Sequence, residues 1–240
     1  MIRKIGVALC ALLIVGVLIQ ILWYQIDGQP LDETLQYLSS SRYETEVRGD
    51  GSILFTPVTG NGHGMVIMHG ALIKPISYAN TAAYFAERGY TVLMPYGTLR
   101  LSILAVNRTA EWIRSSNIES WFFIGHSMGG MATLELEARD GIDAKAIALW
   151  AASIPGDYSD TPAPVLYIRG DNDGLLPNKR AEAAKKFLPA DIREIVIEGA
   201  NHKDFSMYSH QFFDNESRLG WQSQIGRANR ETDAFFDDYH

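Results

Sequence analysis

The stretch WFFIGHSMGGMATLELEA, residues 121–138, decides the fold, because an apolar run ends there in a serine flanked by small residues. Gly125 and Gly129 stand two residues before and after Ser127, which gives the pattern G-x-S-x-G. A serine on a very tight strand-to-helix turn needs tiny neighbours at those positions, because larger side chains would collide with the turn. The stretch therefore predicts a nucleophile elbow, against the alternative of a glycine-rich turn that only packs a helix on a sheet.

Short apolar runs recur along the chain and alternate with segments of helix length. Such runs suit strands that are covered on both faces. They lie at 64–70, 90–95, 120–127, 144–152, 163–171 and 192–200. The alternation predicts an α/β fold, with a mostly parallel central sheet and helices on both faces. An earlier run at 51–58 is expected to be an antiparallel edge strand.

Length, charge and cysteine content narrow the class of protein. The 240 residues, 47% of them hydrophobic, can bury one substantial core, so one globular domain is expected. The formal net charge is −7 and the basic residues are scattered, which argues against a nucleic-acid partner. The single cysteine, Cys10, excludes an internal disulfide and a cysteine-rich metal site. No cofactor and no metal are expected.

The N-terminal segment has the pattern of a membrane anchor. Residues 5–24 carry no charge, follow two basic residues and end in an aromatic pair. At about 1.5 Å per residue they span roughly 30 Å, the thickness of the hydrocarbon core. We expect residues 1–24 to be a single transmembrane helix, a signal-anchor that places the catalytic domain on the extracytoplasmic side of the membrane. The alternative is a secreted protein with a cleaved signal peptide, although no small-x-small site follows the run.

The polar residues 25–50 are expected to form a stalk between this anchor and a domain at 51–240. The segment contains the run SSSR at 39–42 and no apolar run of strand length. A partner of the edge strand expected at 51–58 would lie in this stalk.

A nucleophilic serine needs a base, and the base needs a carboxylate that holds its tautomer. In sheets of this kind, ligands bind beyond the carboxyl ends of the strands, so the loops after the runs are the place to search. The loop in RGDNDGLLP, 169–177, offers Asp171 and Asp173, and EGANHKDF, 198–205, offers His202. The chain order serine, aspartate, histidine is the one expected for a triad on such a sheet.

Spacing favours Asp173 as the acid, because it stands beyond the strand end, whereas Asp171 is expected to bond backbone N–H groups of the turn. The negative charge that develops on an attacked carbonyl oxygen needs two backbone N–H donors. We assign one to Met128, directly after the serine. The other is assigned to Ala71, after the run that ends in MHG, with Leu72 as the alternative.

With these motifs in order, the chain resembles the α/β-hydrolase fold superfamily from about Gly51 to the C-terminus, through MHGA, GHSMGG, GDNDGLLP and GANHKDF. Superfamily relatives carry their acid in a G-x-x-D-x-x-x-P phrase, in which Asp173 takes the acidic position. More narrowly, the chain is similar to small bacterial serine hydrolases with an N-terminal membrane anchor. Phe205, Tyr208 and Gln211 fall where that group has its own Phe, Tyr and Gln.

The resemblance implies a serine hydrolase without a cofactor, and we predict cleavage of a small-molecule carboxylic ester through an acyl-enzyme intermediate. A thioesterase, an amidase or a peptidase on the same fold stays open, as does a non-catalytic binding domain. Many hydrolases of this fold insert a cap of helices after the strand expected at 144–152. Only 12 residues, 153–164, are available here, so no large cap domain is expected.

Overall fold

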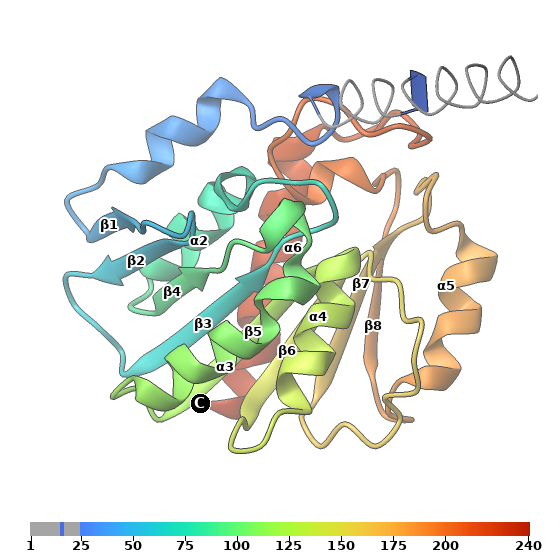
Figure 1. Ribbon diagram of the computed structural model, residues 1–240. Helices are drawn as coiled ribbons and strands as arrows, with labels where there is room; N and C mark the ends of the chain where they lie inside the picture. The colour runs from blue at the N-terminus through green and yellow to red at the C-terminus, as the bar shows by residue number, and fades with distance from the viewer. Residues whose placement is uncertain (1–14, 17–24) are drawn as a thin grey trace, which may run out of the picture.

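The structure, a computed structural model, describes residues 15–16 and 25–240 (Figure 1). The predicted anchor at residues 5–24 lies outside the described residues, except for Val15 and Gly16. Among the described residues, no helix combines the length and the apolar character that crossing a membrane requires.

An eight-stranded sheet forms the centre of the protein, in the order β1-β2-β4-β3-β5-β6-β7-β8 (Figure 1). The pairs β1–β2 and β2–β4 are antiparallel, and all other neighbours are parallel. The strands are β1 (Tyr43–Val47), β2 (Ile53–Pro57), β3 (His63–Met68), β4 (Thr91–Met94), β5 (Ser120–His126), β6 (Ala144–Trp150), β7 (Val165–Gly170) and β8 (Arg193–Ile197). The mostly parallel sheet predicted from the apolar runs is confirmed.

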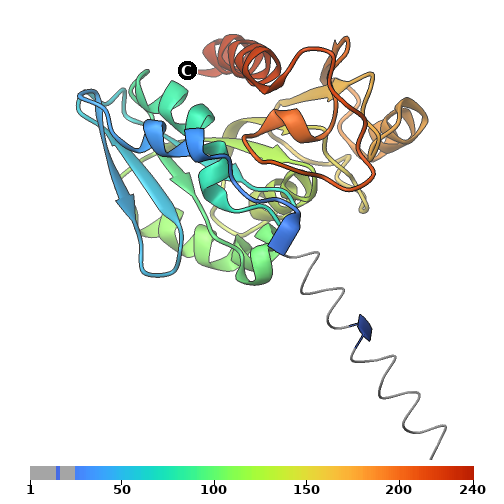
Figure 2. The ribbon, with the colours of Figure 1, turned by 90° about the horizontal axis from the view of Figure 1, so that it is seen from above.

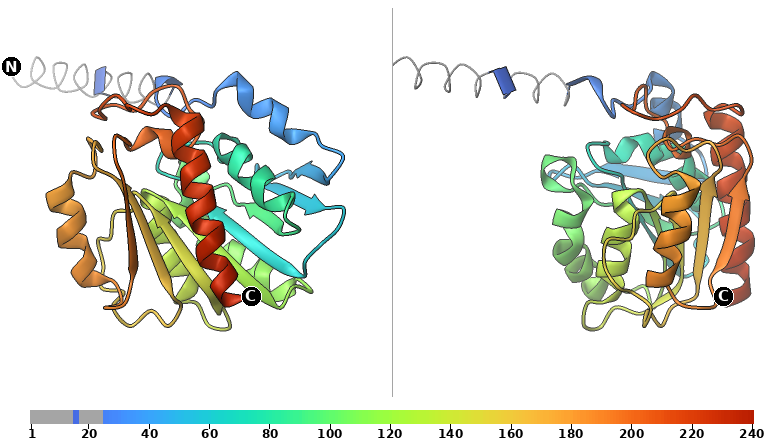
Figure 3. Two further views of the ribbon diagram at one scale, coloured as in Figure 1. Left: turned by 180° about the vertical axis from the view of Figure 1, so that it is seen from behind. Right: turned by 90° about the vertical axis from the view of Figure 1, so that its right-hand side faces the viewer.

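Helices cover both faces of this sheet (Figures 2 and 3). Helices α2 and α6 contribute buried side chains to the core on one face, and α3, α4 and α5 to the core on the other. The α-helices are α2 (Ala79–Ala86), α3 (Val106–Ser115), α4 (Met128–Glu137), α5 (Asn178–Ala184) and α6 (Trp221–Phe236). The 3-10 helices are η1 (Asp32–Leu38), η2 (Pro75–Tyr78), η3 (Thr98–Arg100), η4 (Ser102–Ala105), η5 (Lys185–Phe187), η6 (Lys203–Phe205) and η7 (Asp237–Tyr239).

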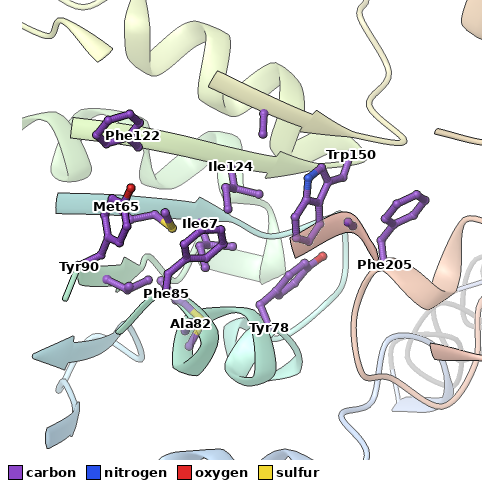
Figure 4. Packing of buried hydrophobic residues seen from close by; sticks show 14 of the residues in the cluster. Met65, Ile67, Tyr78, Ala82, Phe85, Tyr90, Phe122, Ile124, Trp150 and Phe205 are labelled. Atoms are coloured by element: carbon purple, nitrogen blue, oxygen red, sulfur yellow. The ribbon is translucent and has the colours of Figure 1, made fainter. Parts of the chain in front are cut away.

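Strand β5 lies between the two cores and contributes to both. Phe122 and Ile124 belong to the core under α2 and α6, where Trp150 of the neighbouring strand also lies (Figure 4). Trp121 and Phe123 belong to the opposite core. Successive side chains of a strand point to opposite faces, so a strand buried on both faces has a continuous apolar run. This burial explains the sequence that precedes Ser127.

The prediction of a separate polar stalk at residues 25–50 is wrong. Residues 43–47 form β1, the edge strand that pairs with β2, and η1 precedes it. The Tyr43 side chain is buried in the core and donates its hydroxyl proton to the Tyr37 carbonyl oxygen at 2.7 Å. Tyr43 is the only buried residue of β1, so the strand has no run of apolar residues to reveal it. The folded domain therefore begins before residue 51.

The segment just before η1 also docks on the domain. Residues 27–31, which we call the strap, lie along the chain that follows β8 and η6. Pro30 pairs with Tyr208 in an antiparallel bridge, and the Gly28 N–H donates to the His210 carbonyl oxygen at 3.1 Å. The strap thus fixes the beginning of the described domain at the carboxyl end of the sheet, where the predicted site residues lie.

Candidate active site

Ser127 occupies the sharp turn between β5 and α4. Its backbone adopts φ 54° and ψ −121°, a conformation that L-residues rarely take outside strained functional turns. A Cβ atom on Gly125 would lie 2.4 Å from the Gly129 carbonyl oxygen, and a Cβ on Gly129 would lie 2.1 Å from the Met68 carbonyl oxygen. The turn can form only because both glycines lack side chains, as the G-x-S-x-G pattern requires.

The loops after β5, β7 and β8 bring Ser127, Asp173 and His202 into one hydrogen-bonded chain. The His202 Nδ1 atom lies 2.8 Å from Asp173 Oδ2, and His202 Nε2 lies 2.8 Å from Ser127 Oγ. Carboxylate oxygens accept hydrogen bonds, so His202 Nδ1 donates to Asp173 and Nε2 accepts the serine hydroxyl proton. His202 and Asp173 are only 2% and 4% exposed, so the hydrogen bond between them is buried.

The two aspartates of the loop after β7 have different partners. Asp173 Oδ1 accepts the N–H groups of Leu175 at 2.8 Å and Leu176 at 2.6 Å, which leaves Oδ2 for His202. Asp171 is exposed, and its Oδ1 accepts the Gly199 N–H at 2.7 Å. The structure therefore places Asp173 against the histidine and Asp171 on the neighbouring turn.

The backbone N–H groups of Ala71, Leu72 and Met128 differ in whether they already donate a hydrogen bond. The Leu72 N–H donates to the Arg100 carbonyl oxygen at 2.8 Å. Within residues 15–16 and 25–240, neither the Ala71 nor the Met128 N–H has a hydrogen-bond acceptor. Met128 is the first residue of α4, where N–H groups have no partner inside the helix. Ala71 and Met128 therefore keep donors available at the site, and Leu72 does not.

A family model described as "Alpha/beta hydrolase family" matches residues 64–225. The chain belongs to the alpha/beta hydrolase family. The matched range includes every predicted site residue, from Ala71 to His202. No curated protein sequence matches the chain.

Solved structures of other alpha/beta hydrolases share this fold at low sequence identity. An esterase from Thermogutta terrifontis with butyrate bound has a TM-score of 0.60 and 16% identity, covering 82% of this chain and 94% of its own. A Xanthomonas campestris serine hydrolase without lid has a TM-score of 0.56 and 15% identity, covering 82% and 96%. Est1E from Butyrivibrio proteoclasticus, with ferulic acid bound, has a TM-score of 0.59 and 15% identity, covering 82% and 98%. At these identities the likeness shows the fold.

A connection without helices follows β6 in this alpha/beta hydrolase. Residues 151–164, between β6 and β7, contain no helix. No helical cap is therefore inserted at this position, where many hydrolases of the fold carry one.

A second hydrogen-bonded chain, which sequence reasoning missed, lies beneath the triad of this alpha/beta hydrolase. The Gly70 N–H donates to the Tyr78 hydroxyl oxygen at 2.9 Å, and Tyr78 Oη lies 2.7 Å from His126 Nδ1. His126 Nε2 lies 3.1 Å from the His202 carbonyl oxygen, which can only accept, so Nε2 carries the proton and Nδ1 accepts from Tyr78. Complete burial lowers the pKa of His126 well below its ordinary value and keeps the ring neutral. Tyr78 and His126 thus connect the loop that carries Ala71 to the backbone of His202.

His69 holds the same loop from the other side. Its Nδ1 lies 2.8 Å from the Gly70 carbonyl oxygen, and its Nε2 accepts the Gly97 N–H at 3.1 Å. Burial lowers the pKa of His69 to about 4, so the ring is neutral near pH 7. The loops after β3 and β4 are therefore joined through one imidazole.

Asp214 is a further residue of the site that the sequence did not reveal. Its Oδ1 accepts the N–H groups of Gly174 at 3.0 Å and His202 at 3.1 Å, and its Oδ2 accepts the Lys203 N–H at 2.7 Å. One carboxylate thus fixes the loops of Asp173 and His202 relative to each other. Asp214 lies in a polar stretch with no motif, so no local signal identifies it.

Among the described residues, no three His, Cys, Asp or Glu side chains gather into a group that could hold a metal ion.

Proposed function

We propose that the protein is a serine hydrolase that cleaves a carboxylic ester of a small molecule through an acyl-enzyme intermediate, without a cofactor. The observation that carries this proposal is the continuous hydrogen-bonded chain from Asp173 through His202 to Ser127, with both donor–acceptor distances at 2.8 Å. An alternative in which the fold serves only binding would not require this alignment. The esterase names of two structural relatives, one with butyrate and one with ferulic acid bound, support an ester as substrate.

In the proposed first step, Ser127 Oγ attacks the ester carbonyl carbon while His202 Nε2 takes the hydroxyl proton. Asp173 stabilises the imidazolium that forms, and the Ala71 and Met128 N–H groups stabilise the negative charge on the carbonyl oxygen. The tetrahedral intermediate collapses, His202 returns its proton to the departing alkoxide, and the alcohol leaves. Ser127 then carries the acyl group as an ester.

In the second step, water attacks the acyl carbon and gives a proton to His202 Nε2. Collapse of the second intermediate breaks the bond to Ser127 Oγ, which recovers its proton from His202. The carboxylic acid is released and the enzyme is regenerated. The strained turn at Ser127 supports this cycle because it holds Oγ beyond the end of β5, with His202 Nε2 as its hydrogen-bond partner.

We also propose that residues 5–24 anchor the protein in the membrane, with the domain on the extracytoplasmic side. The length of this uncharged run and the two basic residues before it support this location. The full-length chain should then stay with membranes after alkaline carbonate washing. A soluble mature form that begins after residue 20 would instead indicate a cleaved signal peptide.

The experiment that tests the activity is labelling of the full chain with a fluorophosphonate probe, beside the Ser127→Ala variant. Labelling of the unaltered protein and its loss in the variant are expected, because only Ser127 Oγ is removed. A panel of esters, thioesters and anilides of graded acyl length then separates ester hydrolysis from thioesterase, amidase and peptidase activity. A folded protein that neither reacts with the probe nor hydrolyses any of these substrates would contradict the proposal.

A further inference from the structure

Large apolar side chains lie exposed on the loops at the carboxyl end of the sheet, around the proposed site. Leu99 and Leu104, in the two 3-10 helices after β4, are 64% and 56% exposed, and Phe213, in the segment after η6, is 80% exposed. The Phe213 carbonyl oxygen lies 2.5 Å from where a Cβ of Gly174 would be, so this segment borders the loop of Asp173. We call the surface formed by Leu99, Leu104 and Phe213 the site face.

The backbone holds two of these side chains outward in an unfavourable conformation. Leu99 has φ 58° and Phe213 has φ 70°, both in the left-handed region that glycine and asparagine tolerate best. At Leu99, packing within the described part of the chain does not explain the choice of residue, because its side chain is mostly exposed. Strain that is retained in a folded protein gathers at functional positions, which suggests a use for apolar groups here.

The strap brings the apolar N-terminal sequence to the same face. The Gly28 backbone lies against the loop after β3 that carries Ala71 and Leu72, and a Cβ on Gly28 would be 2.5 Å from the Leu72 carbonyl oxygen. Asp27 is 3% exposed, and its Oδ1 accepts the Phe212 N–H at 3.1 Å. The domain thus begins at the carboxyl end of the sheet, beside the loop of Ala71 and Leu72.

The distance between this fixed point and the end of the apolar run is short. Residues 5–24 end three positions before Asp27. Three residues of fully extended chain reach about 10 Å, so a bilayer that contains residues 5–24 lies within that distance of the strap. A domain tied so closely presents the surface around its tie point to the lipid headgroups.

We infer that the site face rests on the lipid bilayer, with Leu99, Leu104 and Phe213 in contact with lipid, and that the site takes an amphiphilic ester from the membrane. This inference rests on the proposed function and narrows its substrate to an ester whose acyl chain is held in lipid. The apolar groups contribute the favourable transfer of hydrocarbon out of water, and the strap sets the orientation. A water-soluble ester reaches Ser127 without this contact.

Contact with lipid is tested on the full chain in phosphatidylcholine vesicles. The single cysteine, Cys10, is replaced by serine, and a polarity-sensitive fluorophore is attached to Leu99→Cys, Phe213→Cys or, as a control, Val58→Cys. Val58 is 69% exposed and follows β2 at the opposite end of the sheet. We expect brominated phosphatidylcholine to quench the labels at 99 and 213 and not the label at 58. Labels at 99 and 213 that stay in water, or that are shielded without quenching because a second copy covers them, would overturn the inference.

The consequence for substrate is tested with the double variant L99N/F213N. Asparagine suits the positive φ of both positions, so the fold is kept while the apolar groups are removed. The ratio of hydrolysis of a long-chain ester in vesicles to hydrolysis of p-nitrophenyl acetate should fall about tenfold, whereas Val58→Asn should leave it unchanged. An unchanged ratio in the double variant overturns the inference about the site face. Failure of the unaltered protein to hydrolyse either ester would instead contradict the proposed function.

Discussion

Replacement of Asp173 by asparagine should abolish most of the activity while leaving the fold intact. The amide oxygen of asparagine can keep the two hydrogen bonds that Asp173 Oδ1 accepts from Leu175 and Leu176. Its NH2 group then faces His202 Nδ1, 2.8 Å away, and can only donate. The imidazole must carry its proton on Nε2, which points at Ser127 Oγ and can no longer accept the hydroxyl proton. The charge that stabilises the imidazolium is also lost.

By the precedent of serine hydrolases with this arrangement, the wrong tautomer lowers kcat about 10⁴-fold, which corresponds to about 5 kcal/mol of transition-state stabilisation. Initial rates on an activated short-chain ester give kcat, and urea unfolding should show a loss of stability below about 1 kcal/mol, because the backbone hydrogen bonds remain. Asp171→Asn is the matched control, since Asp171 accepts the Gly199 N–H and, among the described residues, has no hydrogen bond to a triad residue. A folded Asp173→Asn variant with activity within tenfold of the unaltered protein would refute the assignment.

Three further substitutions test other parts of the structure. Tyr78→Phe leaves the buried Gly70 N–H without its acceptor and His126 without its donor. The loop that carries Ala71 and the backbone of His202 then lose a common support, so kcat should fall on the order of tenfold with little change in KM. An equal change in KM would indicate a different role for Tyr78. Glu137→Gln should remove a pH dependence of the free energy of unfolding. Burial raises the pKa of the Glu137 carboxyl to about 7 from 4.5, so the folded state binds the proton more tightly than the unfolded state. The free energy of unfolding of the unaltered protein should therefore fall by about 3 kcal/mol as the pH rises from 4.5 to 7. Urea unfolding at pH 5 and pH 8 measures this fall, and its persistence in the variant would contradict the reasoning. Gly129→Ala should unfold the elbow and lower the free energy of unfolding by on the order of 3 kcal/mol, because its Cβ would lie 2.1 Å from the Met68 carbonyl oxygen. Thermal unfolding and labelling with the fluorophosphonate probe measure this effect. A stable, labelled variant would show that the turn tolerates a side chain.

Features with a local cause were predictable from the sequence. The central parallel strands are buried on both faces and so have continuous apolar runs, and the turn at Ser127 excludes side chains at Gly125 and Gly129. Asp173 and His202 were found because each follows a strand, and the carboxyl ends of parallel strands share one edge of the sheet.

Features that depend on tertiary contacts were not predictable. In β1, only Tyr43 is buried, and α6 buries polar residues such as Gln224 and Asn229, so neither element has a clear apolar pattern. The polar sequence of residues 25–50 therefore suggested a stalk. Tyr78 and Asp214 act through partners that are distant in the chain, and nothing in their neighbouring residues marks them.

The strap has a consequence for the order in which a newly made chain can fold. Asp27 meets His210, which lies 183 residues further along the chain. At about 5 to 20 residues per second, the ribosome needs roughly 10 to 40 s to make that interval. Throughout this time the N-terminal residues have no docking surface, and the loop beside Leu72 lacks one of its supports. The strap is therefore one of the last parts of the domain to form, and a ribosome-bound chain that ends before residue 202 holds the proposed nucleophile without its base.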